Sequence, residues 1–189
     1  PIPPYDNAGY TLAFTMGIEF DRILESFDGP FEKIGGFATP LAGSVTNAQG
    51  AAGFLLSHEL NDAVVATNRL LADNQEVYWL TAPLSANGGT YPAGTIYIPA
   101  RSSTRGMLEA MATELGLSFD GVGTAPTGNA LQVRPVRIGL WDRYGGSMPS
   151  GWTRWLFEQF EFPFQLVYPQ ELDGGNLRRK FDVLVFVNG

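Results

Sequence analysis

The residues of this chain that are best suited to binding a ligand form one loop, between a predicted strand at 136–141 and a predicted helix that starts near Pro149. The six members of this loop are Asp142, Arg143, Tyr144, Gly145, Gly146 and Ser147. A loop in this position directs backbone N–H groups and a helix N-terminus toward an anion held above a sheet. The pattern is neither G-x-G-x-x-G nor a Walker loop, so the glycines could equally serve only a tight turn.

A zinc site is suggested only by His58 and Glu59, and the spacing does not support it. His58 is the one histidine in the chain. A helical zinc motif needs a second histidine four residues later, where Asp62 stands, and a carboxypeptidase-type pair needs a glutamate three residues later, where Asn61 stands. We therefore predict no metal ligands in this chain and expect His58 to cap or hydrogen-bond a loop.

The chain shows no recognisable nucleophile. It has no cysteine, which excludes disulfides, thiolate zinc sites and a cysteine nucleophile within it. Ser147 does not lie in a G-x-S-x-G elbow, and the single histidine falls in a different predicted unit. We predict no catalytic residue. Trp152 and Trp155, three residues apart on one predicted helix, are expected to pack in the core, with a sugar-stacking platform as the alternative.

Composition narrows the possible partners. The net charge is −7 and no Lys/Arg cluster stands out, so a nucleic-acid partner is not expected. No apolar run approaches the roughly 20 residues of a membrane span, and no signal peptide is visible. The apolar fraction of 44% is enough for a sizeable core. We expect both ends of the chain to be cuts from a longer protein.

The order of predicted elements favours an α/β fold with mostly parallel sheets and flanking helices. Apolar strands at 53–57, 76–80 and 95–98 alternate with helices that start near Asn61 and Ser103, and the second helix ends at Gly116. Asn87-Gly88 predicts a hairpin turn. We expect a connector with short strands at 1–50, a first α/β unit at 51–130 and a second at 131–189.

Seven stretches of the chain are familiar as a set. They are PPYD at 3–6, GYTL at 9–12, MGIEFDR at 16–22, NRLL at 68–71, RIGLWD at 137–142, YGGSMPSGWTR at 144–154 and FDVLVF at 181–186. Together they resemble the region C-terminal to the catalytic domain in large exported bacterial zinc carboxypeptidases of the carboxypeptidase A-like class. The resemblance covers nearly the whole chain, and the stretch at 144–154 is its most specific part.

The resemblance implies a non-catalytic accessory domain whose partner is the catalytic domain of the same polypeptide. The zinc and its ligands would lie in that upstream domain, with no cofactor in this chain, and the protein would be secreted or periplasmic. The implied fold is flavodoxin-like, similar to a class I glutamine amidotransferase, with residues 131–189 as a truncated half that ends before the amidotransferase cysteine. The alternatives are a module that binds a small anion or sugar and, less favoured, a truncated amidotransferase-like enzyme.

Overall fold

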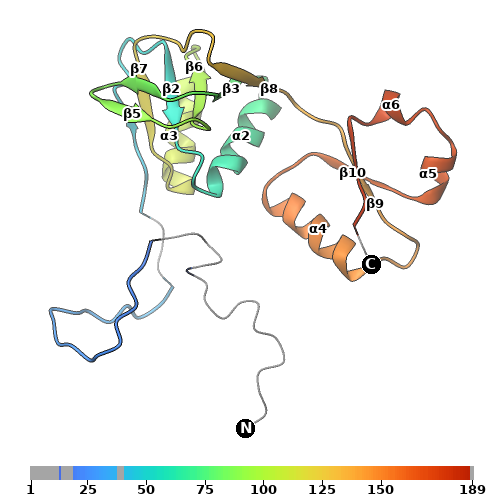
Figure 1. Cartoon of the computed structure of the whole chain (residues 1–189), viewed down its shortest axis with the longest axis horizontal. Coiled ribbons are helices and arrows are strands. Elements are labelled where there is room, and N and C mark those ends of the chain that lie inside the picture. Colours follow the sequence, from blue (N-terminus) through green and yellow to red (C-terminus); the bar gives the residue numbers. More distant parts are fainter. Residues whose placement is uncertain (1–12, 14–18, 38–40, 188–189) are drawn as a thin grey trace. The chain divides into compact units, whose positions relative to one another are not determined.

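The computed structural model describes residues 13, 19–37 and 41–187 (Figure 1), which belong to two units, Pro1–Ala38 and Thr39–Gly189. In the first unit, residues 19–37 form neither helix nor strand and their side chains are exposed. None of the short strands predicted in the connector at 1–50 therefore forms within residues 19–37, and residues 1–12 and 14–18 lie outside the described residues. The rings of Phe27 and Phe31 contact each other edge to face at 5.3 Å.

The second unit contains a six-stranded sheet in the order β1-β7-β2-β6-β3-β8. Its strands are β1 (Val45–Thr46), β2 (Gly53–Leu56), β3 (Val77–Leu80), β6 (Ile96–Pro99), β7 (Phe119–Val122) and β8 (Ala130–Val133). Only β1 and β7 pair in parallel, and the other four pairs are antiparallel. The prediction of mostly parallel sheets is wrong here, because β6 inserts between β2 and β3 and runs against both.

The centre of this sheet follows a split β-α-β pattern. Helix α2 (Asp62–Ala72) connects β2 to β3, and helix α3 (Thr104–Leu115) connects β6 to β7. The resulting spatial order β7-β2-β6-β3 is that of a β-α-β-β-α-β ferredoxin-like unit. The predicted strand, helix and strand at 53–80 are all present, and β2 and β3 run in the same direction, but they are not neighbours.

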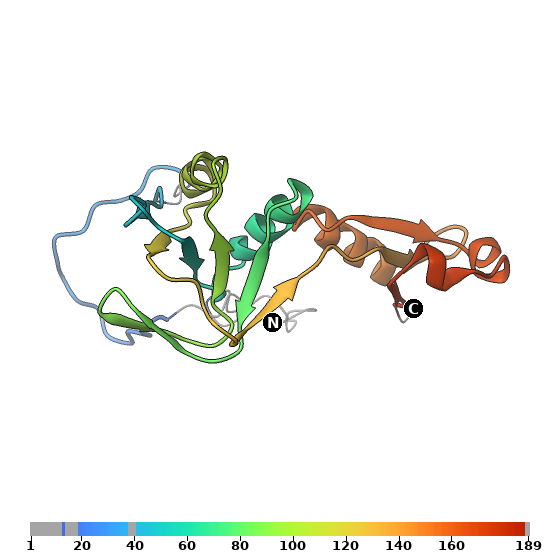
Figure 2. The same cartoon turned by 90° about the horizontal axis from the view of Figure 1, so that it is seen from above.

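The two faces of the sheet are covered differently. Successive strand residues point to opposite faces, so Phe54 and Leu56 face α2 and α3 whereas Leu55 faces away. The opposite face is covered by a hairpin of β4 (Leu84–Ala86) and β5 (Gly89–Tyr91). Seen from above, the helices and the hairpin lie on opposite sides of the strands (Figure 2).

The hairpin turn confirms the prediction from Asn87-Gly88. Both residues have positive φ, +52° and +77°, as a type I′ turn requires. Asn87 Nδ2 also donates to Asp120 Oδ2 at 2.8 Å, and Tyr91 Oη donates to the same oxygen. The other carboxylate oxygen accepts from Thr46 Oγ1 at 2.9 Å and Asn47 Nδ2 at 2.6 Å. Asp120 therefore connects the hairpin, β7 and the end of β1.

These hydrogen bonds set the ionisation of Asp120. Partial burial by itself would raise the pKa of this carboxyl, but the bonds from Tyr91, Asn87, Asn47 and Thr46 outweigh burial and lower the pKa to about 2. The charged form is thus favoured by the fold. The same carboxylate raises the pKa of the Tyr91 hydroxyl, which donates to it.

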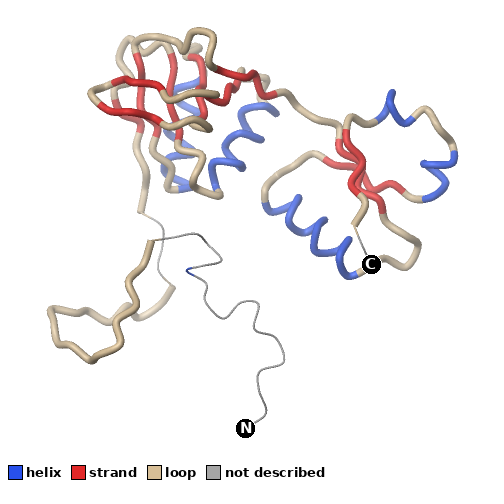
Figure 3. Tube along the Cα trace, viewed as in Figure 1, coloured by secondary structure: helices blue, strands red, loops and turns tan. Residues whose placement is uncertain are grey.

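A separate three-stranded sheet follows, in the order β10-β9-β11, with both pairs parallel. Its elements are β9 (Ile138–Trp141), α4 (Met148–Gln159), β10 (Phe164–Val167), α5 (Pro169–Asp173), α6 (Leu177–Lys180) and β11 (Val183–Val185). The alternation of strands and helices is plain in Figure 3. Here the predicted parallel pairing is correct, and the chain has two sheets, one mixed and one parallel.

Packing and charge both fix the central strand β9. A Cβ on Gly139 would come within 2.7 Å of Leu184 and 2.9 Å of Val167, so only glycine fits between the neighbouring side chains without displacement. At the start of the strand, Asp182 Oδ2 accepts from the backbone N of Arg137 at 3.0 Å and from its Nε at 2.9 Å. These contacts hold β11 in register beside β9 and keep the pKa of Asp182 below its usual range.

Two of the predicted boundaries fall close to strands of the mixed sheet. β1 lies within the predicted connector at 1–50 and pairs with β7, and β8 starts at Ala130 and pairs with β3. Strand residues 131–133 therefore belong to the mixed sheet. Within the described ranges, no helix is both long and apolar enough to cross a membrane.

Replacing Asp120 by Asn should lower stability and flatten its pH dependence. Because the folded-state pKa of about 2 lies below the ordinary value of 3.8, Asp120 stabilises the fold fully above about pH 4, and this contribution disappears as the pH falls toward 2. We expect a loss of about 1 kcal/mol at pH 7, allowing for solvent screening. Urea unfolding from pH 2 to pH 7 would measure it.

The matched control is Asp21→Asn, which changes an exposed carboxylate in the irregular segment. The difference in unfolding free energy between wild type and Asp120→Asn should shrink below pH 4. A difference that stays constant down to pH 2 would contradict the assignment.

Candidate functional site

The loop of Asp142, Arg143, Tyr144, Gly145, Gly146 and Ser147 joins β9 to α4, as predicted. Gly145 and Gly146 have φ of +87° and +74°, so the turn needs both glycines. Arg143 Nε donates to the Gly146 carbonyl at 3.1 Å, and Asp142 Oδ1 accepts from Arg143 N at 2.8 Å. The charged side chains thus brace the loop, while Tyr144 is fully exposed.

The position of this loop matches the place where open parallel sheets bind ligands. The chain leaves β9 through α4 to reach β10 on one side, then returns through α5 and α6 to β11 on the other side. This reversal of direction, with helices on opposite faces, is the arrangement found beside ligand sites at the carboxyl ends of strands. The rings of Trp141 and Phe186 lie 6.1 Å apart at that edge.

A buried hydroxyl lies in the first turn of α4. Ser147 caps the helix by accepting from Ser150 N at 3.3 Å. The Ser150 side chain is 1% exposed, and in the described part of the chain its Oγ is the one buried side-chain polar atom without a hydrogen-bond partner. A buried hydroxyl without a hydrogen-bond partner costs about 1–3 kcal/mol of stability. A polar ligand or a water molecule that bonds to Ser150 Oγ would remove this cost.

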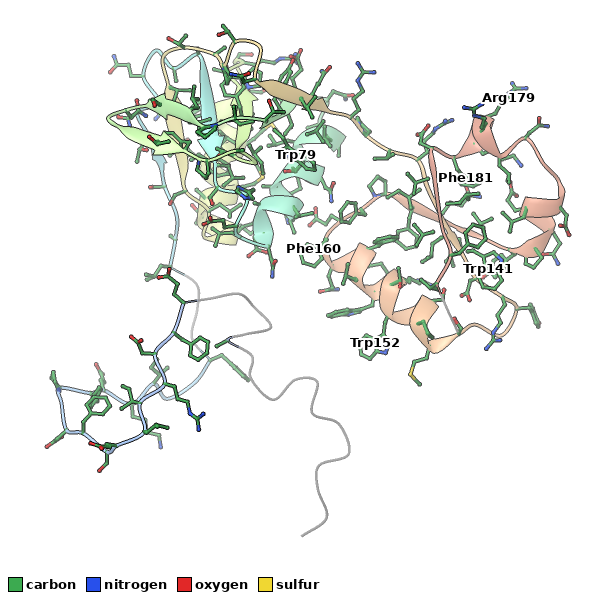
Figure 4. All side chains as sticks on the ribbon, in the orientation of Figure 1. Trp79, Trp141, Trp152, Phe160, Arg179 and Phe181 are labelled. Carbon is green, nitrogen blue, oxygen red and sulfur yellow. The ribbon has the colours of Figure 1, made fainter. Side chains whose placement is uncertain are left out.

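Trp152 and Trp155 are not core residues, so that prediction is wrong. Their side chains are 64% and 53% exposed, and their rings meet edge to face at 6.0 Å. Trp152 is labelled on α4 in Figure 4. The helix turns Ser150 inward and places both tryptophans outward together with Met148 and Leu156, which are also exposed. We call these four residues the α4 apolar surface. It is the most aromatic exposed patch contributed by one helix in the described residues.

The residues do not fit a zinc ion. No group of three or more His, Cys, Asp or Glu side chains in the described ranges is arranged to hold a metal. His58 instead packs against the backbone of Gly94, where φ is +90° and a Cβ would come within 3.0 Å of the imidazole ring.

Sequence reasoning missed a cavity of about 740 Å³ beside α2. Its wall is almost entirely apolar and is built from α2, β3, the segment after β8 and the start of β10. Val64, Leu71, Trp79, Val133, Phe162 and Phe164 contribute to it. The residues come from positions 58 to 164, so no local pattern could have indicated it. In Figure 4, Trp79 marks the side of the cavity formed by the mixed sheet.

One arginine on α2 holds the two sides of this cavity together. The Arg69 guanidinium donates to Glu161 at 2.9–3.2 Å and to Glu114 at 2.8–2.9 Å. Asn68 Nδ2 adds a bond to the Phe160 carbonyl at 2.7 Å. Bonding to Glu161 and Glu114 raises the pKa of Arg69 above its already high value. Glu161 is held with φ of +55°, an uncommon conformation for a residue with a side chain.

Comparison of the chain with protein-family models, curated proteins and solved structures gives no match.

Replacing Arg69 by Met should destabilise the Thr39–Gly189 unit by about 1–2 kcal/mol, because methionine keeps the apolar stem but removes a hydrogen-bonded network with two carboxylates. Urea unfolding followed by circular dichroism would measure the change. Arg105→Met is the matched control, since Arg105 makes only an exposed pair with Glu109 one helical turn away and should cost about 0.5 kcal/mol or less. Equal effects of the two substitutions would show that the Arg69 network has no special structural role.

Proposed function

We propose that this chain is a non-catalytic accessory domain of an exported zinc carboxypeptidase and that it packs against the catalytic domain through the α4 apolar surface. The observation that carries the docking role is the outward position of Trp152 and Trp155, 64% and 53% exposed on one helix. Burying such side chains supplies most of the binding energy in many protein interfaces, where tryptophan is enriched. The identity of the partner comes from the resemblance in sequence.

The chemistry of the α4 apolar surface suits a partner domain better than a small solute. Met148 and Leu156 extend the two rings into a continuous apolar patch, and Arg154, which lies among them in sequence, is paired with Glu158 at 2.8 Å. An exposed apolar patch rimmed by paired charges is typical of a protein contact. In this proposal, zinc and the hydrolytic chemistry belong to the catalytic domain, and this chain supplies a surface. The proposed location of the protein is secreted or periplasmic.

The proposed fold relationship rests on the parallel sheet alone. The strand order β10-β9-β11 matches the first three strands of the flavodoxin-like order 2-1-3-4-5. Class I glutamine amidotransferases are the proposed relatives of this half. The mixed sheet, with its split β-α-β order, does not share that arrangement.

Sequencing the gene upstream of this segment and measuring docking would test the proposal. We expect a His-x-x-Glu motif followed by a distant His upstream. The separately purified upstream domain should bind this chain in calorimetry, and Trp152→Ala with Trp155→Ala should raise Kd about tenfold or more, since each ring would be a central contact. Leu131→Ala, which removes an exposed apolar side chain on β8, is the control and should leave Kd unchanged. An upstream region without the motif, or binding indifferent to both tryptophans, would remove the basis of the proposal.

A second function, binding of a small anion or sugar over the loop at 142–147, is favoured by the buried unpaired hydroxyl of Ser150. That hydroxyl lies in the first turn of α4, next to the capping residue Ser147. The partial positive charge of a helix N-terminus favours an anion there. Trp141 ends β9 just before the loop and provides a nearby fluorophore.

Inorganic phosphate, sulfate and a panel of simple sugars should be titrated while tryptophan fluorescence is recorded. If the loop binds one of them, the signal saturates and Ser150→Ala weakens binding about tenfold, the effect of losing one hydrogen bond to a charged ligand. Ser85→Ala, on the exposed face of β4, should change nothing. Without a ligand, Ser150→Ala should be neutral or stabilising because it removes an unpaired buried group. A flat titration across the panel would exclude this function.

A further inference from the structure

We propose that the cavity beside α2 binds a small amphipathic carboxylate, with its aliphatic or aromatic body among the apolar residues and its carboxylate at Arg134. This site shares no residue with the loop at 142–147 or with the α4 apolar surface. Ligand binding in this cavity is therefore independent of the two proposed functions. Three properties of the cavity support it, namely its size, its lining and its charge.

The size and lining of the cavity suit a ligand of moderate size. A volume of about 740 Å³ lies within the range of roughly 300–1,000 Å³ found for small-molecule sites. Val64 and Leu71 line it from α2, and Trp79, which is 49% exposed, lines it from β3. Apolar cavities offer water few hydrogen-bond partners, so an apolar ligand gains by filling them. The body of the ligand is therefore a hydrocarbon chain or ring.

The charge of the ligand follows from the side chains that line the cavity. Two glutamates line it, but Glu158 is paired with Arg154 and Glu161 with Arg69. Arg134 also lines it and has neither an ion pair nor a side-chain hydrogen bond within the described residues. His58, which follows β2, also lines the cavity. The one guanidinium left unneutralised calls for a single negative charge, and a carboxylate matches its planar fork.

A bulky polyanion is a poorer fit than a monocarboxylate. The chain carries a net charge of −7, which repels multiply charged ligands. An amphipathic monoanion is repelled least and gains most from the apolar wall. Arg69, on α2, does not line the cavity and uses its donors on Glu161 and Glu114, so Arg134 sets the position of the carboxylate.

Calorimetric titration of the full chain with octanoate, decanoate and decan-1-ol tests this inference directly. Decanoate should bind about tenfold more tightly than octanoate, because two more methylene groups are buried. It should also bind about tenfold more tightly than decan-1-ol, which lacks the charge that Arg134 recognises. In Arg134→Gln the preference for decanoate over the alcohol should disappear. Arg178→Gln, on α6 and outside the cavity lining, is the matched control and should keep that preference.

Substitutions that fill the cavity distinguish decanoate binding inside it from decanoate adsorption elsewhere on the protein. Ala72→Trp, at the exposed end of α2, and Val64→Trp each place a large ring in the cavity and should reduce decanoate binding by about tenfold or more. Ala72 lies at the helix end, so its variant is expected to stay folded by circular dichroism even if Val64→Trp does not. Absence of saturable decanoate binding, or binding that a folded Ala72→Trp variant retains in full, would overturn the proposal.

Discussion

A single guanidinium, that of Arg69, joins α2 to two segments that lie far from it in the sequence. It donates from α2 to Glu114 at the end of α3 and to Glu161 in the turn after α4. Arginine can do this because its planar fork presents five donors in fixed directions, whereas a lysine would offer only a point charge. The side chain is 28% exposed, so solvent weakens the Coulombic attraction. Its main contribution is therefore geometric: together with the bond from Asn68 to the Phe160 carbonyl, it connects α2 to the segment at 158–164, and both segments line the cavity.

The local elements could be read from the sequence, and the sheet order could not. Asn87-Gly88 predicted its hairpin and Gly116 its helix end because each adopts a left-handed conformation that the turn requires. Apolar strands look alike whether their neighbours run parallel or antiparallel. Nothing near 96–99 indicates that this strand returns between β2 and β3, because that choice depends on packing over the whole unit. For the same reason, helices that alternate with strands in the sequence predict parallel pairing even where, as in the mixed sheet, the strands pair antiparallel.

The buried face of α4 could not be predicted from the sequence for a related reason. Apolar residues surround much of this helix, from Met148 and Trp152 to Phe157, so their spacing does not specify one inner stripe. The outcome depends on Ser150, a small side chain that lets the first turn lie close to the sheet. Of the candidate site, the loop at 142–147 could be predicted because it is contiguous. Ser150 and the Arg134 cavity depend on contacts between distant segments and carry no local signal.

Charge distribution distinguishes the surfaces of this protein by the partner each can accept. Five of the ten arginines are paired with a carboxylate within the described residues, as in the pairs of Arg101 with Glu76 and Arg137 with Asp182, and the chain as a whole is acidic. The net negative charge therefore repels an anion at long range, and a binding site must overcome this repulsion by attracting the anion through direct contacts. In the loop at 142–147, backbone N–H groups and the Ser150 hydroxyl would have to supply that attraction, since Arg143 is used within the loop. At the α2 cavity, the apolar wall supplies most of the attraction and Arg134 supplies the rest. Of the two anionic ligands, the amphipathic carboxylate at the α2 cavity is therefore the better match to this protein. The α4 apolar surface needs no charged partner and suits another protein domain.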